Sequence, residues 1–152
     1  MKLPLSADIS VSDTLYALEL GNEPDLYLGN GQQIATDLGT WSPELDAASE
    51  ATWQIAVGEA LNRTAIIQAG NFVSGPPKWS AAELLANENA SAVPYIKDWS
   101  HHNYHQGGSN ANLEMLVNHT DISANIADYT ADLEVANVTG REYVIGETNS
   151  GA

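Results

Sequence analysis

The sequence has no cysteine and few basic residues, and each shortage excludes a class of protein. Without cysteine, disulfide bonds cannot stabilise the fold, and zinc sites built on thiolates are excluded. Twenty acidic residues face five basic ones, which gives a formal net charge of −15. A charge of this sign repels phosphate backbones and anionic lipids, so we expect no nucleic-acid or membrane partner.

Long apolar runs are also missing. The opening residues, MKLPLSADIS, lack the apolar centre of a signal peptide, and no later run is long enough to cross a bilayer. Four glycosylation sequons nevertheless begin at Asn62, Asn89, Asn118 and Asn137. Because that number is high for a short chain, we expect a secreted protein whose leader lies outside this sequence.

Enough apolar residues are present for one domain, or part of one: they make up 43% of the 152 residues. Short apolar runs predict strands at 15–20, 65–70, 95–100 and 142–147. Helices are predicted by N-cap signals at Ser42 and Ser80, and by an apolar stripe over 122–133 that ends before Gly140.

This alternation of strands and helices predicts parallel strands with helical crossovers, and therefore an α/β layer architecture. The loops at 22–41, 71–79 and 101–110 follow strands and are rich in Gly, Asn, Pro, Ser and aromatic residues. In parallel α/β folds, functional sites are built at the C-terminal ends of the strands. We therefore expect the site among these loops.

Two glutamates, Glu23 and Glu147, follow the first and the fourth apolar run. Parallel strands would place both at one edge of the sheet, where differently solvated carboxyl groups can divide the roles of acid and nucleophile. Either glutamate alone is equally well explained as a solvated loop residue or a helix-cap partner. Their flanking residues decide between these interpretations.

Three motifs supply that context: ELGNEPDLY at 19–27, WSHHNY at 99–104 and IGETNS at 145–150. Together and in this order they resemble glycoside hydrolase family 79, the heparanase and β-glucuronidase family, in particular its fungal β-glucuronidase type. The resemblance covers nearly the whole chain. It implies a partial (β/α)8 TIM barrel, with residues 1–152 as the central part that holds barrel strands four to seven.

A complete barrel needs roughly 250 residues and eight strands. The remaining strands, and the C-terminal β-sandwich that the family usually adds, are therefore expected to be absent from this chain.

The resemblance also implies a retaining mechanism through a glycosyl-enzyme intermediate, with no cofactor and no metal. It makes Glu23 the general acid/base and Glu147 the nucleophile, and it implies that Asn22 hydrogen-bonds the sugar 2-hydroxyl. Retaining hydrolysis requires the two carboxyl groups to lie roughly 5–5.5 Å apart. Pro24 is expected to end the first strand and to leave Glu23 facing the pocket.

The WSHHNY motif adds two further expectations. Tyr104 stands where the family has a tyrosine that hydrogen-bonds the nucleophile and keeps it ionised. His101, His102 and His105 would suit a metal site by their spacing, but no carboxylate sits among them. We expect instead that they stack or hydrogen-bond around the sugar, with His102 in the substrate-binding set.

Glu19 precedes Glu23 by four positions, about 13 Å in a strand at ~3.3 Å per residue, so it is expected outside the reaction centre. We interpret it as a structural carboxylate with a buried cationic partner on a neighbouring strand. Of the tryptophans, Trp53 is expected in the core because it lies within a helix. Trp41 and Trp79, in loops, are candidates for stacking on sugar.

The function that the resemblance implies is hydrolysis of β-linked glucuronides. Two alternatives stay open: a catalytically inactive half-barrel that at most binds carbohydrate, and a neutral-sugar β-glycosidase of the same clan. An isolated flat sheet would hold its two outer strands about 14 Å apart and leave their edges free for self-association. The acidic charge disfavours long polyanionic substrates, so glucuronides on neutral glycans fit better.

Overall fold

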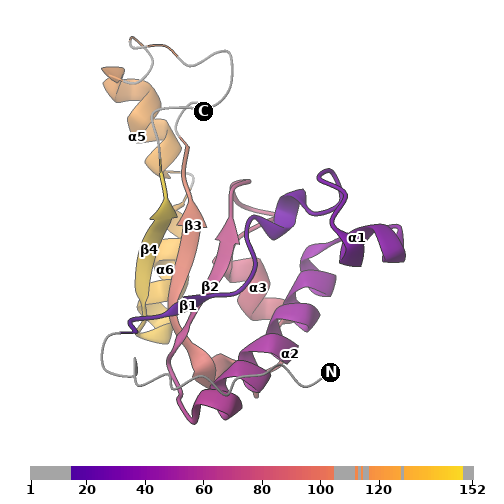
Figure 1. Cartoon of the computed structure of the whole chain (residues 1–152). Helices are drawn as coiled ribbons and strands as arrows, with labels where there is room; N and C mark the ends of the chain where they lie inside the picture. Colours follow the sequence, from indigo (N-terminus) through magenta and orange to yellow (C-terminus); the bar gives the residue numbers. More distant parts are fainter. Residues whose placement is uncertain (1–14, 105–111, 113, 115–116, 128, 149–152) are drawn as a thin grey trace.

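The computed structural model describes residues 15–104, 112, 114, 117–127 and 129–148 (Figure 1). Its centre is one parallel sheet in the order β1-β2-β3-β4. The strands are β1 (Leu18–Glu19), β2 (Ile67–Phe72), β3 (Ile96–His102) and β4 (Glu142–Glu147). Four parallel strands with intervening helices confirm the predicted α/β architecture, and they are consistent with part of a TIM barrel.

Five α-helices and two 3-10 turns connect the described strands. They are α1 (Gln33–Leu38), α2 (Pro43–Leu61), α3 (Ala81–Asn87), α5 (His119–Ala127), α6 (Thr130–Thr139), η1 (Pro24–Leu26) and η2 (Val93–Tyr95). Both predicted N-caps form, since Ser42 Oγ accepts from the Leu45 N–H and Ser80 Oγ from the Glu83 N–H. Gly140 ends α6 in the left-handed region, at φ 65°.

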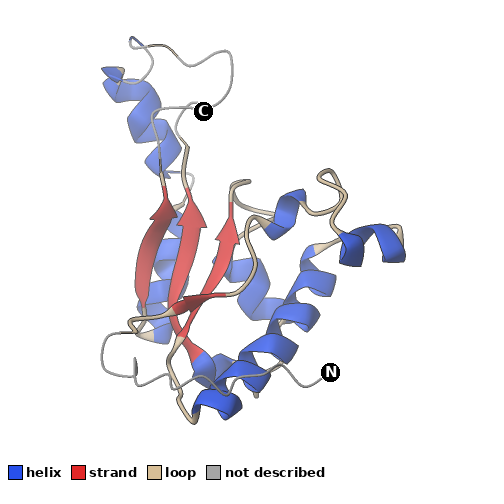
Figure 2. Cartoon of the chain, in the orientation of Figure 1, coloured by secondary structure: helices blue, strands red, loops and turns tan. Residues whose placement is uncertain are grey.

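The two faces of the sheet differ in character (Figure 2). Helices α3 and α6 pack on one face, where apolar residues such as Ile67 are buried and the Trp99 indole N–H donates to Thr139 Oγ1 at 3.0 Å. Side chains alternate along a strand, so their neighbours point the other way. Gln68 Nε2 donates to Ser100 Oγ at 3.2 Å on that second face. Polar side chains therefore lie on this second face, between β2 and β3.

The first strand is shorter than predicted at both ends, and on its C-terminal side the chain turns soon after Glu19. Gly21 (φ 83°) and Glu23 (φ 48°) both adopt the left-handed conformation, which an extended strand cannot continue. The prediction that Pro24 ends the strand is therefore wrong. The strand ends earlier, and Pro24 instead occupies the first position of η1.

Two other predicted elements also change. The stripe over 122–133 is divided between α5 and α6, with Tyr129 as the N-cap of α6, and Ile126 and Leu133 are 57% and 46% exposed. Strand β3 runs two residues further than predicted, to His102. Because His101 and His102 lie on a strand, their side chains alternate between its faces.

The tryptophans depart from expectation. Trp53 is 52% exposed. The buried side of α2 is formed instead by residues three or four positions apart from one another, such as Glu50 and Gln54. Trp41 and Trp79 are buried instead, against Tyr27 and Phe72 at ring-centroid distances of 5.7 and 5.4 Å. In the described residues, no helix is long and apolar enough to cross a membrane.

Candidate active site

The segment that carries Glu23 is fastened to the C-terminal end of β2 and to the loop after it. The Glu23 N–H donates to the Asn71 carbonyl at 3.1 Å. The Asp25 carboxylate accepts from the N–H groups of Val73 and Ser74 at 3.2 and 2.6 Å. These bonds hold the turn over the end of β2, one strand further into the sheet than β1. Sequence reasoning did not single out Asp25, although it directly follows the Asn-Glu-Pro motif.

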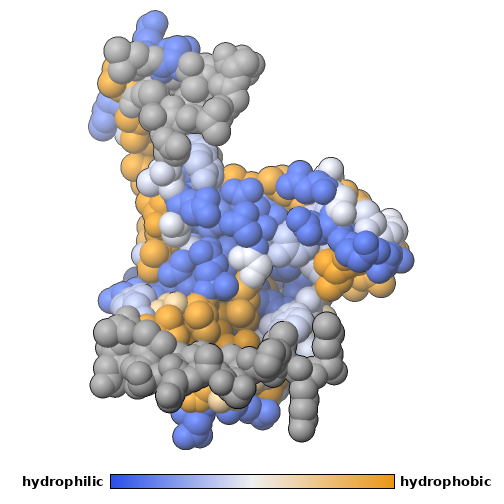
Figure 3. All heavy atoms as spheres, viewed as in Figure 1, coloured by the Kyte–Doolittle hydropathy of each residue, from blue (hydrophilic) through white to orange (hydrophobic). Residues whose placement is uncertain are grey.

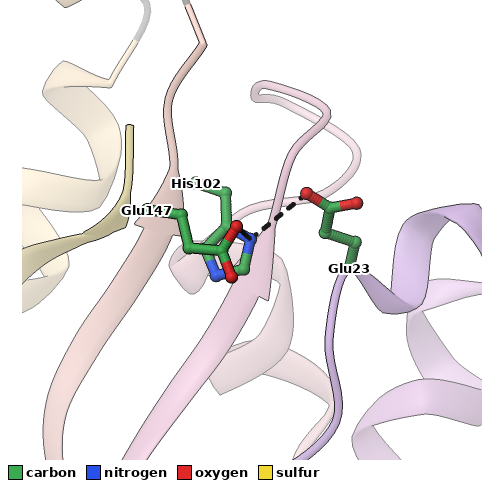
Figure 4. A group of neighbouring side chains, drawn as sticks. All are labelled: Glu23, His102 and Glu147. Atoms are coloured by element: carbon green, nitrogen blue, oxygen red, sulfur yellow. Dashed lines mark hydrogen bonds and ion pairs between the residues drawn. The ribbon is translucent and has the colours of Figure 1, made fainter. Parts of the chain in front are cut away.

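Glu23, His102 and Glu147 converge at the C-terminal ends of the strands (Figure 4). His102 Nδ1 lies 3.3 Å from Glu23 Oε1 and 3.7 Å from Glu147 Oε2. One atom from each of the three side chains lies within 4.8 Å of the others. The outer strands of a flat sheet would keep the carboxylates apart. Here the turn carries Glu23 inward and the long side chains reach over β2 and β3.

Hydrophilic side chains gather near the C-terminal ends of the strands (Figure 3). The Tyr104 hydroxyl donates to Glu147 Oε2 at 2.6 Å, so the hydrogen bond that the resemblance implies is present. This bond to a carboxylate raises the pKa of Tyr104 to about 12. At neutral pH the hydroxyl therefore keeps its proton and remains a donor to Glu147.

Glu19 lies closer to the reaction centre than predicted. Its Oε1 is 2.9 Å from His102 Nε2, so one imidazole joins Glu19 to Glu23 and Glu147. The expected 13 Å separation from Glu23 required an extended strand, and the left-handed turn at Gly21 removes it. The buried partner of Glu19 is thus His102, two strands away on β3 rather than on the adjacent strand.

The electrostatic environment of His102 is strongly acidic. Burial alone lowers the pKa of this imidazole, but hydrogen bonds to Glu19 and Glu23 and the charge of Glu147 raise it above the ordinary value overall. Each carboxylate favours the protonated ring. His102 therefore holds positive charge more readily than a solvated histidine.

The remaining predicted residues are placed as follows. Asn22 is exposed beside the turn, and its N–H donates to the Tyr27 hydroxyl at 3.3 Å. His101 points to the helical face, with its ring centroid 4.1 Å from that of Tyr129, and burial lowers its pKa to about 4. His101 and His102 thus face opposite ways and do not form a shared metal site. His105 lies outside the described residues.

Among the residues that the structure describes, Glu23, His102 and Glu147 are the set close enough to bind one ion together. Two carboxylates and an imidazole are acceptable ligands for several divalent metals. Two carboxyl groups that lie close together are also what retaining glycoside hydrolysis needs, at a separation of roughly 5–5.5 Å. Comparison with known proteins bears on this choice.

No family model matches the chain. It is 29% identical over 171 residues to a β-glucuronidase from Aspergillus niger, an alignment that covers 97% of this chain and 29% of that protein. It also matches the crystal structure of a 4-O-α-L-rhamnosyl-β-D-glucuronidase from Fusarium oxysporum 12S, a Rha-GlcA complex. That match has a TM-score of 0.82 and 36% identity, and it covers 92% of this chain and 30% of the other. This chain resembles glucuronidases.

The chain thus spans about 30% of the length of these relatives. The likeness includes both the fold and the sequence. Both relatives are named as glucuronidases, which are glycoside hydrolases.

Proposed function

We propose that this chain carries the catalytic residues of a retaining β-glycoside hydrolase of the β-glucuronidase type. The observation that carries the proposal is the approach of Glu23 and Glu147, with atoms within 4.8 Å of each other at the C-terminal edge of a parallel sheet. Such proximity suits a nucleophile and an acid that act on the same glycosidic bond.

In this mechanism the Glu147 carboxylate attacks the anomeric carbon while the Glu23 carboxyl group protonates the departing oxygen. The product of this step is a glycosyl ester of Glu147. Glu23, now ionised, then removes a proton from water. The water oxygen attacks the anomeric carbon, and the bond from that carbon to Glu147 breaks, which restores the Glu147 carboxylate. Tyr104 supports the ionised nucleophile by its hydrogen bond.

Two other residues are proposed to contact the sugar. Asn22 is exposed next to Glu23 and is assigned to the 2-hydroxyl. His102 is assigned to the substrate-binding set because its Nδ1 lies between the two carboxylates. We further propose that the four parallel strands are strands four to seven of a barrel.

The glycone is proposed to be a β-linked glucuronic acid, because both relatives are named as glucuronidases. The name of the Fusarium protein makes glucuronides that carry a 4-O-rhamnosyl group a second substrate to test. The net charge of −15 argues against long polyanionic chains as substrates.

The test is to assay the full-length protein that contains this chain on nitrophenyl β-glucuronide, its 4-O-rhamnosyl derivative and nitrophenyl β-glucoside. We expect turnover of a glucuronide, a product whose first-formed anomer is β by proton NMR, and no effect of a chelator. Preference for the glucoside would reassign the enzyme to neutral sugars. Inversion of the anomer, or loss of activity on chelation, would contradict the proposed mechanism.

The two roles can be separated by variants. Glu147→Gln is expected to remove nearly all turnover because no nucleophile is left. Glu23→Gln should still form the glycosyl-enzyme from substrates with a good leaving group, and azide should restore the second step. If azide rescues Glu147→Gln with retained configuration, the two roles are reversed.

We also propose that the protein is secreted and glycosylated. The asparagines of all four sequons, Asn62, Asn89, Asn118 and Asn137, are exposed, which leaves them open to a glycosyltransferase. A decrease in apparent mass after enzymatic deglycosylation of the natural protein is the expected result.

A further inference from the structure

We propose that Glu19 is a positioning residue of the catalytic site, which holds the His102 ring so that Nδ1 faces Glu23 and Glu147. This inference rests on the proposed function. It concerns a carboxylate that the sequence placed outside the reaction centre. The contacts of the His102 imidazole support this role for Glu19.

His102 is anchored at both ends of its ring. Its side chain is completely buried on β3, and Nε2 lies 2.9 Å from Glu19 Oε1. An imidazole is rigid and planar, so a bond at Nε2 together with a fixed Cβ determines where Nδ1 points. Here Nδ1 points into the space between Glu23 and Glu147, 3.3 and 3.7 Å from their nearest oxygens.

The chemistry of Glu19 also decides which nitrogen carries the proton. An ionised carboxylate only accepts hydrogen bonds, so Nε2 must be the donor. Nδ1 can then accept from Glu23 when that carboxyl group is protonated. When the ring is charged, Nδ1 donates to Glu23 in its ionised form, and the strongly acidic surroundings of His102 favour this second state.

This arrangement fits the needs of a retaining enzyme. Its acid/base residue is protonated in the first step and ionised in the second, and it must keep its position in both. An imidazole whose Nε2 is committed to Glu19 offers Nδ1 as a partner for either form of Glu23. His101, which faces the helices, is not available for this task.

The test uses the full-length protein with three variants: Glu19→Ala, Glu19→Gln and the control Glu134→Gln, which changes an exposed carboxylate on α6. Loss of an outer-shell residue that orients a metal ligand typically costs 10- to 100-fold, and we take the same range for a residue that orients a catalytic partner. We expect Glu19→Ala to lower kcat by roughly that factor while KM changes by less than about threefold. Glu19→Gln should recover most of kcat, because its amide oxygen still accepts from Nε2.

Long-range nitrogen–proton NMR spectra of the imidazole give a readout that does not depend on turnover. In the wild-type protein Nε2 of His102 should keep its proton both in the charged ring and, at higher pH, in the neutral ring. Glu19→Ala should lose this preference for Nε2 in the neutral ring, while Glu19→Gln keeps it. A bare Nε2 in the wild type would overturn the proposal. So would a Glu19→Gln variant as slow as Glu19→Ala, because a hydrogen-bond role predicts rescue.

The two proposals fail in different ways. A wild-type protein that hydrolyses no glycoside refutes the proposed function. A wild-type protein that is active, together with a Glu19→Ala variant of equal kcat, refutes only the positioning role of Glu19.

Discussion

At the scale of single residues, the bond between Tyr104 and Glu147 leads to a kinetic prediction. Tyr104→Phe removes the only hydroxyl group that the described residues offer to Glu147 and leaves the aromatic ring in place. If the hydroxyl keeps the nucleophile ionised, kcat should fall by about 10-fold or more with little change in KM. Steady-state kinetics on a nitrophenyl glucuronide measures both constants.

A purely structural Tyr104 would give the opposite pattern. Unfolding temperature would then drop while kcat stayed at the wild-type value. A matched control is Tyr16→Phe, which also removes a hydroxyl that donates to a glutamate, Glu142, but at an exposed position away from the site. This control should leave kcat unchanged.

At the scale of an element, Gly58 shows how packing reverses a helix propensity. Glycine inside a helix costs about 1 kcal/mol relative to alanine, so propensity predicts that Gly58→Ala in α2 stabilises the protein. A methyl group at this position would instead collide with the ring of Tyr95 in η2. We expect Gly58→Ala to lower the free energy of unfolding by roughly 1–3 kcal/mol.

Chemical denaturation followed by circular dichroism measures this change. Thr52→Ala lies on the exposed side of the same helix and serves as the control, with an expected gain of no more than about 0.7 kcal/mol. Stabilisation by Gly58→Ala would mean that Tyr95 moves away without cost, and that η2 is not packed tightly against α2.

At the scale of the whole molecule, buried carboxyl groups make stability depend on pH. Burial raises the pKa of Glu88 to about 8, and of Asp98 and Asp132 to about 6; the pKa of Asp46 and of Glu50 is also raised by burial. A raised folded-state pKa contributes stability that is complete at low pH and is lost as pH rises through the folded pKa.

The carboxyl groups therefore favour the folded state at pH 5 over pH 8. His101 acts in the opposite direction, because its lowered pKa costs stability as pH falls from about 6.5 toward 4. The combined effect of the five carboxyl groups on folding stability exceeds the opposite effect of one imidazole. The unfolding temperature should therefore be higher at pH 5 than at pH 8. Differential scanning calorimetry at the two values measures the difference.

Glu88→Gln tests the origin of this pH dependence. Both carboxylate oxygens of Glu88 are buried, and no described residue lies in hydrogen-bonding position to either, so a neutral amide should be favoured over a charge at pH 8. We expect the variant to gain on the order of 1 kcal/mol at pH 8 and little at pH 5. Glu59→Gln, at an exposed site on α2, should show neither effect. Equal stability of wild type and Glu88→Gln at pH 8 would contradict this explanation.

The sheet edges predict the behaviour of the 152-residue chain by itself. β1 and β4 are the outer strands, and Ile145 on β4 is 54% exposed. Unpaired edges with exposed apolar residues favour pairing between chains, so we expect self-association and no turnover. Ile145→Lys should reduce the association seen in analytical ultracentrifugation, whereas Val138→Lys on α6 should not. A monomeric chain that hydrolyses a glucuronide would refute this prediction.

The sequence by itself determined the order of the elements, because apolar period, N-caps and the glycine at position 140 are local signals that need no tertiary contact. It also indicated Glu23, Glu147 and Tyr104, through motifs whose meaning came from a resemblance. Local signals failed where long-range contacts decide the outcome. Exposure of Trp53 depends on which side of α2 is buried, and that follows from packing rather than from spacing.

Only the tertiary structure decided the place of Glu19 and the distance between the two catalytic candidates. Extended geometry separates Glu19 from Glu23, but two left-handed residues fold the chain back and allow both carboxylates to reach His102. Glu23 follows β1 and Glu147 ends β4, and these two strands are separated in the sheet by β2 and β3. The approach of the carboxylates depends on a turn fastened to the C-terminal end of β2 and to the loop after it, a long-range contact that no local pattern in the sequence encodes.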